Sequence, residues 1–204
     1  MRTEEHWDKV YRTKQSTAVS WYQPSPLPSL KVLDLFATGK ALSLIDVGGG
    51  ASNLADALLA RGWSDITVLD IAAPALRVAQ ERLGEEAERV RWEVADITNY
   101  QPLRTYDVWH DRAVFHFLTS LGERQSYKRA LTGGTTAGSL VVVSTFALDG
   151  PERCSGLVVQ RYSADSLSQE LGSDFKMLEA WHEKHTTPDG NEQAFNWCVF
   201  KRTP

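Results

Sequence analysis

Short apolar segments alternate along most of the chain with segments whose apolar residues recur at helical spacing. This alternation is typical of stacked strand–helix units, which build a mostly parallel sheet. The pattern therefore predicts an α/β protein of the doubly wound, Rossmann-like type. We predict strands over residues 42–47, 66–70, 90–94, 106–110 and 140–146, and helices over residues 52–61, 73–83, 122–131 and 163–171.

The end of the chain departs from this rhythm. Residues 175–185 and 193–202 both have strand-like composition, and no helix-like segment separates them. Residues 188–191, Pro-Asp-Gly-Asn, supply the chemistry of a tight turn. Two strands joined by so short a connection have to be antiparallel. We therefore expect the sheet to finish in an antiparallel hairpin.

The first 40 residues follow neither pattern. Trp7, Tyr11, Trp21 and Tyr22 lie among polar residues, and three prolines follow between positions 24 and 28. A chain of 204 residues suits one domain. Within it we predict a capping arm over residues 1–40, a ligand-binding core over residues 41–146, and a lid segment with the terminal hairpin over residues 147–204.

Composition and charge exclude several classes of function. The chain has 22 Lys and Arg against 26 Asp and Glu, and no basic run, which disfavours a nucleic-acid partner. Its longest apolar stretches are about half the roughly 20 residues of a membrane span. With two cysteines and no apolar leader in its first nine residues, we expect a cytoplasmic protein. No sustained heptad repeat predicts a particular oligomeric state.

The most specific motif is the glycine turn Asp46-Val47-Gly48-Gly49-Gly50, between the first strand and the first helix of the predicted core. Glycine lets a ligand approach the backbone closely, although such turns also serve simple chain reversal. Asp70 and Asp96 follow the next two predicted strands. Each of these acids could instead be a helix cap or a turn residue. Together, however, they mark one ligand site, because ligands of open α/β sheets bind at the carboxyl ends of strands.

Asp70 lies 20 residues after Gly50, where a carboxylate can accept both hydroxyls of a ribose. A nicotinamide or flavin dinucleotide would need a third glycine at position 53, which is Asn53. Asp46, directly before the glycines, also suits a cationic ligand better than a pyrophosphate. The motif therefore favours a nucleoside without phosphates over a dinucleotide.

These features together resemble the class I S-adenosylmethionine-dependent methyltransferases over about residues 40–202. The resemblance implies a seven-stranded sheet whose last strand is antiparallel, with S-adenosylmethionine as cofactor and S-adenosylhomocysteine as product. It places Gly48 and Gly50 at the methionine part, Asp70 at the ribose, and Asp96 with Ile97 at the adenine. The full predicted cofactor set is Asp46, Gly48, Gly49, Gly50, Asp70, Ile71, Asp96, Ile97, His110 and Trp21.

Two further segments bear on the substrate. Residues 106–113 resemble the Asp-Arg-Gly-type segment of the thiopurine methyltransferase-like and small bacterial branches, with Ala113 in place of the glycine. Residues 7–22 resemble the arm that closes over the cofactor in several small methyltransferases. A related arm also occurs in protein-lysine methyltransferases.

Methyl transfer from a sulfonium is an in-line displacement that needs positioning and exclusion of water more than covalent help. His110 and Asp111 are the candidate catalytic residues, because they follow the fourth predicted strand and a histidine titrates near neutrality. Structural packing is the alternative for His110, and a surface location is the alternative for Arg161. We predict no metal site, since His182 and His185 would point to opposite faces of a strand. The candidate substrate-binding residues are Tyr11, Arg112, Phe146, Arg161 and His185.

The sequence therefore predicts a methyltransferase that acts on a small molecule. Protein-lysine methylation and non-catalytic binding of S-adenosylmethionine by a regulatory protein are the alternatives. A dinucleotide oxidoreductase fits less well, because of Asn53 and the terminal hairpin.

Overall fold

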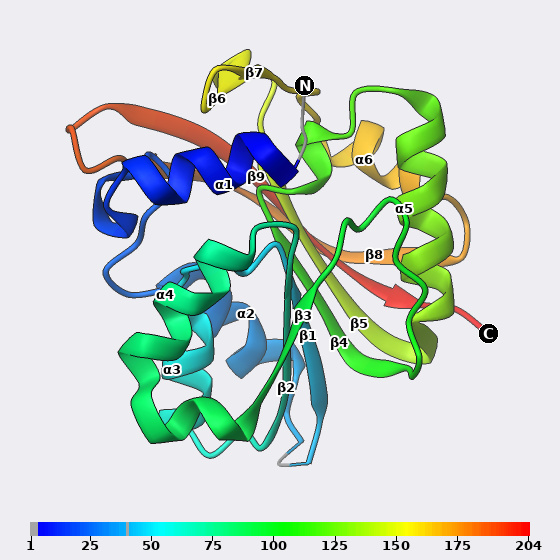
Figure 1. Cartoon of the computed structure of the whole chain (residues 1–204). Helices are drawn as coiled ribbons and strands as arrows, with labels where there is room; N and C mark the ends of the chain where they lie inside the picture. The colour runs from blue at the N-terminus through cyan, green and yellow to red at the C-terminus, as the bar shows by residue number, and fades with distance from the viewer. Residues whose placement is uncertain (1–3, 40) are drawn as a thin grey trace.

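The computed structural model describes residues 4–39 and 41–204, which form a seven-stranded sheet with helices on both faces (Figure 1). The strand order is β3-β2-β1-β4-β5-β9-β8. The strands of the sheet are β1 (Ser43–Val47), β2 (Asp65–Asp70), β3 (Val90–Val94), β4 (Tyr106–Arg112), β5 (Thr135–Phe146), β8 (Phe175–Thr186) and β9 (Glu192–Arg202). The helices are α1 (Glu4–Thr13), α2 (Leu27–Phe36), α3 (Leu54–Ala60), α4 (Ala73–Leu83), α5 (Leu121–Gly133) and α6 (Ala164–Leu171), with 3-10 turns η1 (Ser16–Ala18), η2 (Gly84–Arg89) and η3 (Phe115–Phe117).

The sheet topology confirms the predicted fold. β1 to β5 pair in parallel, and β9 pairs antiparallel with β5 on one side and with β8 on the other. Every predicted strand and helix is present. The largest boundary difference is at β5, which begins at Thr135 rather than near residue 140, because its first residues are polar and mostly exposed. Burial pattern alone does not mark such a strand end.

Alternate residues of the strands supply two hydrophobic clusters, one on each face of the sheet. Leu44, Val108 and Val142 belong to the first cluster, and their neighbours Ile45, Trp109 and Val143 belong to the second. Helices α2, α3 and α4 cover the first face, whereas α5 and α6 cover the second. The strands therefore read as continuous apolar runs because both of their faces are buried.

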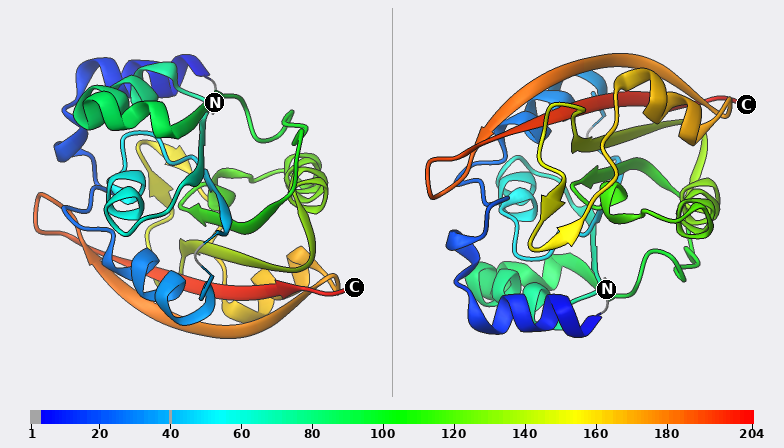
Figure 2. Two further views of the ribbon diagram at one scale, coloured as in Figure 1. Left: turned by 90° about the horizontal axis from the view of Figure 1, so that it is seen from below. Right: turned by 90° about the horizontal axis from the view of Figure 1, so that it is seen from above.

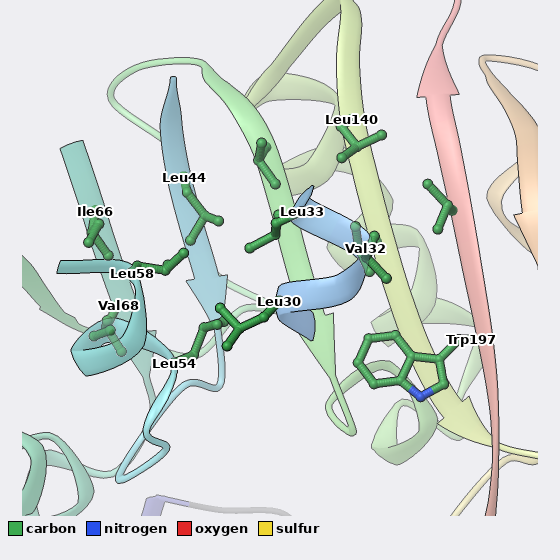
Figure 3. Close-up of a cluster of buried hydrophobic side chains, with 14 of the residues drawn as sticks. Leu30, Val32, Leu33, Leu44, Leu54, Leu58, Ile66, Val68, Leu140 and Trp197 are labelled. Atoms are coloured by element: carbon green, nitrogen blue, oxygen red, sulfur yellow. The ribbon is translucent and has the colours of Figure 1, made fainter. Parts of the chain in front are cut away.

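Helix α2 corrects the prediction that residues 1–40 form one capping arm. Leu30, Val32 and Leu33 of this helix are buried against the sheet, as Figure 3 shows for Leu30 and Leu33 beside Leu44. Proline near the start of a helix fits there, because the first turn has no N–H bond to lose. Pro28 therefore begins a core helix instead of interrupting the chain.

Helix α1 and a small hairpin, β6 (Arg153–Cys154) with β7 (Leu157–Val158), lie at the end of the sheet where the parallel strands finish (Figures 1 and 2). Ser155 and Gly156 both have positive φ, 50° and 80°, as the two-residue turn of this hairpin requires. Within the described ranges, no helix is long and apolar enough to cross a membrane. Helix α1 and the β6–β7 hairpin together cover a space above the ends of the parallel strands.

Candidate active site

The glycine turn after β1 leaves bare backbone at the centre of the sheet edge. Gly48 and Gly50 have φ of 67° and 47°, which favours glycine. A Cβ on Gly48 would lie 2.0 Å from Cγ2 of Val114, and one on Gly49 would lie 2.5 Å from Oδ2 of Asp46. The N–H groups of Gly48 and Gly49 donate to the carbonyl of Leu69 and so fix the turn against β2. A side chain at either position would collide with its surroundings.

A cavity opens beside this turn and runs along the ends of β1, β2, β3 and β4. Asp70 and Asp96 line it from one side, and α1 and the β6–β7 hairpin close it from above. A second cavity continues past Gly48 towards Asp46 and His110. The main cavity is lined by Trp7, Tyr11, Trp21, Val47, Gly48, Leu69, Asp70, Ile71, Ala95, Asp96, Ile97, Thr98, Arg112, Ala113, Val114, Phe117, Leu118, Glu123 and Cys154.

Asp70 is a buried carboxylate at the wall of the main cavity. Its Oδ1 accepts a hydrogen bond from the N–H of Ala72 at 2.8 Å. Burial raises the pKa of Asp70 to about 7, and the negative charge of Asp46 acts in the same direction. Asp70 thus closes a local turn instead of capping α4, whose N-cap is Ala72 without a side-chain cap bond, and it keeps an oxygen for a ligand.

Asp96, after β3, resembles Asp70 in that one of its carboxylate oxygens accepts local hydrogen bonds. Its Oδ1 accepts from the backbone N–H and the hydroxyl of Thr98, both at 2.8 Å, which closes a local turn. The second oxygen makes no hydrogen bond within the described ranges. Ile97 and Leu118 supply buried apolar walls beside it. This corner suits a flat ring that carries a hydrogen-bond donor.

His110 is held by hydrogen bonds on both ring nitrogens. Nδ1 lies 2.7 Å from Oδ1 of Asp46, its register partner on β1, and Nε2 lies 2.9 Å from the hydroxyl of Ser29 on α2. All three side chains are buried. The ring lines the second cavity, but as placed it has no nitrogen free to take a proton from a substrate. The geometry therefore favours the structural alternative for His110.

Asp111 likewise serves the backbone. It is fully buried, lies outside both cavities, and accepts from the N–H groups of Val114 and Phe115 at 3.0 and 3.3 Å. Burial raises its pKa to about 6. The predicted catalytic role of Asp111 has no support in this geometry, because the carboxylate shapes the loop after β4 instead of facing the cavity.

Three core side chains fasten the segment between η1 and α2. Arg112 donates to the carbonyl of Trp21, Asn53 donates to the carbonyl of Gln23, and Nε2 of His185 lies 2.8 Å from the carbonyl of Ser20. These contacts hold Trp21 over the glycine turn. The segment from Ser20 to Gln23 is therefore fixed beside the glycine turn.

The candidate substrate residues divide into two groups. Tyr11 and Arg112 line both cavities. Phe146 and His185 are buried outside them, and His185 supports the cap instead. Arg161 donates to the carbonyl of Gly150 and to Glu152 in the loop after β5, away from both cavities. Phe146, His185 and Arg161 thus lose their predicted contact with a substrate.

Several lining residues had no distinctive signal in the sequence. Trp7 reaches the cavity because it shares a helical face with Tyr11, a spacing of four that would have shown the face had α1 been predicted. Phe117 and Leu118 lie in a 3-10 turn without regular periodicity. Ser29, the partner of His110, is an ordinary serine in the sequence. Only its position on α2 reveals its role.

A known family model matches the part of the chain that carries the glycine turn, Asp70 and Asp96. Residues 44–132, from β1 to α5, match the family model described as a methyltransferase domain. The chain carries a methyltransferase domain over these residues. S-adenosylmethionine is the methyl donor that the resemblance in the sequence implies, and solved structures of this fold are described as dependent on it. A search of curated proteins found no match to the sequence.

Solved structures share the fold of this methyltransferase at low sequence identity. A methyltransferase from Anabaena variabilis, described as S-adenosylmethionine-dependent, is 17% identical with a TM-score of 0.74, over 98% of this chain and 93% of that one. The 1,6-didemethyltoxoflavin-N1-methyltransferase of Burkholderia thailandensis, solved with 1,6-didemethyltoxoflavin and S-adenosylhomocysteine, is 15% identical with a TM-score of 0.73, over 98% and 87% of the two chains. A structure from work on thioacetal formation in echinomycin biosynthesis is 17% identical with a TM-score of 0.75, over 98% and 93%.

Two titratable groups of the methyltransferase near the lid carry no charge at neutral pH. Burial raises the pKa of the Cys154 thiol to about 11. Burial and the charge of Arg112 lower the pKa of His116 to about 3, and Nδ1 of His116 accepts from the N–H of Phe146. Neither group is a proton acceptor matched to neutral pH. Their surroundings make this part of the site apolar.

Proposed function

We propose that the methyltransferase transfers the methyl group to a small-molecule acceptor by in-line displacement, with the donor held in the half of the cavity that carries Gly48, Asp70 and Asp96. The observation that carries this proposal is the cover over the cavity. Trp7 and Trp21 from the N-terminal segment and Cys154 from the β6–β7 hairpin line the same cavity as the two acids. An acceptor has to fit beneath them, which favours a small molecule over a folded protein.

The residues of the donor half fit S-adenosylmethionine. Asp70 has a carboxylate oxygen free for the ribose hydroxyls, and Asp96 has one free for the adenine amine. Asp46 places negative charge behind the bare backbone of Gly49, where the methionine ammonium would bind favourably. When bound, the cofactor supplies a methyl carbon made electrophilic by its sulfonium.

The remaining contribution of the protein is orientation and exclusion of water. Tyr11 and Trp21 lie over the glycine turn, and Phe117 and Val114 wall the cavity on the side of β4. Glu123 also lines the cavity, but its Oε2 accepts from the N–H of Ser120 in the cap of α5. Both ring nitrogens of His110 are engaged in hydrogen bonds. We therefore propose that the attacking atom of the acceptor is already unprotonated when it binds, so that no general base is needed.

Transfer of a labelled methyl group tests the proposed acceptor class. The purified protein and methyl-labelled S-adenosylmethionine are added to a cell extract, which is then separated by size. We expect the label in the small-molecule fraction. Label in one discrete protein band would instead support protein methylation. Cofactor binding without transfer to either fraction would support a non-catalytic regulatory protein.

The affinity for S-adenosylhomocysteine should rise with pH up to about 8. Without ligand the pKa of Asp70 is about 7, and only the ionised carboxylate accepts two ribose hydroxyls without giving up a proton. Below pH 7 binding must therefore release a proton, and we expect the affinity to fall by up to about tenfold per pH unit. Titration calorimetry between pH 6 and 8.5, in buffers of different ionisation enthalpy, measures both effects. A flat pH profile in the wild type, matching that of Asp70→Asn, would refute this coupling.

A further inference from the structure

Arg112 is a cation in the wall of the main cavity, and it forms no ion pair with any residue that the structure describes. Its guanidinium donates to the carbonyl of Trp21 at 2.9 Å through Nη1. Its Nε and Nη2 are shielded from solvent and have no hydrogen-bond partner within residues 4–39 and 41–204. Burial lowers its pKa to about 10, so the group stays charged at neutral pH. A desolvated charge of this kind is costly unless something pairs with it.

The carboxylates closest to Arg112 in charge interaction are occupied elsewhere. Glu183 accepts from the indole N–H of Trp197 and, at 3.4 Å, from Gln23. Asp46 is bound to His110. Neither forms an ion pair with Arg112, and the neighbouring histidines His116 and His185 are both shifted towards their neutral forms by burial and by Arg112 itself. Glu183 and Asp46 therefore favour the positive charge of Arg112 without forming an ion pair with it.

Arg112 lines the main cavity on the side of β4 and β9, and it also lines the second cavity beside Gly48. The guanidinium carbon lies 5.0 Å from the ring centroid of Phe195 on β9, whereas Asp70 and Asp96 follow β2 and β3 at the other end of the sheet. Three aromatic side chains line the same cavity, where Trp7 packs edge-to-face against Trp21 and Phe117 with ring centroids 5.7 and 5.1 Å apart. Aromatic walls of this kind favour a flat, unsaturated ligand.

We propose that the acceptor is a planar aromatic compound with an anionic group, and that Arg112 binds that group. A carboxylate or an ionised heteroatom would satisfy the two free N–H donors through charge-assisted hydrogen bonds, and the guanidinium fork suits bidentate contact. The inference rests on the proposed function, and it explains why the cavity needs a cation but no free base. An anionic acceptor also brings the lone pair that the reaction requires.

Binding of matched acids and amides tests the proposal. The wild type is saturated with S-adenosylhomocysteine and titrated with benzoate, 2-naphthoate and indole-3-carboxylate, each paired with its amide, while tryptophan fluorescence is recorded. We expect the acids to bind about tenfold more tightly than the amides. Arg112→Gln should remove this preference, because only the acids gain from the positive charge. Arg112→Lys, which keeps the charge, should retain part of it.

Arg91→Gln is the matched control, because it removes one positive charge at an exposed site on β3. No preference for acids in any of the three pairs, or a preference that survives Arg112→Gln, would overturn the proposal. If Arg112→Gln abolished binding of S-adenosylhomocysteine, Arg112 would be assigned to the carboxylate of the donor instead. Failure of the wild type to bind S-adenosylhomocysteine at all would refute the proposed function, and is therefore distinct from these outcomes.

Discussion

Replacing Asp70 with asparagine is expected to weaken the binding of S-adenosylhomocysteine by about 100-fold. The carboxylate has one oxygen on the N–H of Ala72 and one left for the ribose proposed in the main cavity. Asparagine puts an amide NH2 where that oxygen would accept the two ribose hydroxyls. Hydrogen bonds to a charged group contribute about 1.5–3 kcal/mol each, so the loss amounts to about 3 kcal/mol. Asparagine keeps an acceptor for Ala72, so the turn should remain. Titration calorimetry on both proteins measures the change.

The same substitution should leave the free protein as stable as the wild type or more stable at pH 8. The folded-state pKa of Asp70, about 7, lies above its ordinary value of 3.8. Its contribution to stability is therefore present below pH 4 and lost as the pH rises through 7. Removing the charge removes this penalty at pH 8. Urea unfolding gives the comparison. Unchanged affinity in Asp70→Asn would sink the assignment of Asp70 to the cofactor.

Replacing His110 with leucine is expected to lower the free energy of unfolding by about 3 kcal/mol. The change leaves the buried carboxylate of Asp46 without its partner on Nδ1 and the hydroxyl of Ser29 without its partner on Nε2. Leaving a buried charged group without its hydrogen-bond partner costs about 1–3 kcal/mol or more, and the orphaned hydroxyl of Ser29 adds to this. The measurement is the midpoint and slope of urea unfolding for the purified variant.

Ser29→Ala is the control for His110→Leu, because it removes only the outer hydrogen bond of the chain. We expect it to cost about 1 kcal/mol. If His110→Leu kept the wild-type stability but lost methyl transfer, His110 would have a direct part in the chemistry rather than a positioning one. A loss of stability with transfer retained at low temperature would support positioning through Asp46.

The strands and helices of the core were predictable because each is marked by burial on a regular period. Helix α4 and strand β3 have the predicted boundaries, and the terminal hairpin turns at Gly190 with φ of 82°. Helix α2 was missed because its prolines read as interruptions. Proline is tolerated in the first turn of a helix, and only packing against the sheet distinguishes the two cases.

The sequence predicted the candidate site only where its residues lie at the ends of predicted strands. The glycine turn, Asp70 and Asp96 were found because successive strand ends of a parallel sheet converge at one edge. The roles of His110 and Arg112 could not be separated in the same way. They are two residues apart on β4, where alternate side chains should share a face. His110 is saturated by Asp46 and Ser29, whereas Nε and Nη2 of Arg112 have no partner among the described residues.

The sequence by itself determined the fold class, the order of the elements and the donor half of the site. These features depend on hydrophobic periodicity and on glycines within short segments of the chain. Only the tertiary structure decided which polar side chains are already satisfied. The partner of His110 comes from α2, and the cover over the cavity comes from α1 and the β6–β7 hairpin. These contacts join segments distant in the chain, and no local pattern encodes whether a buried group meets its partner.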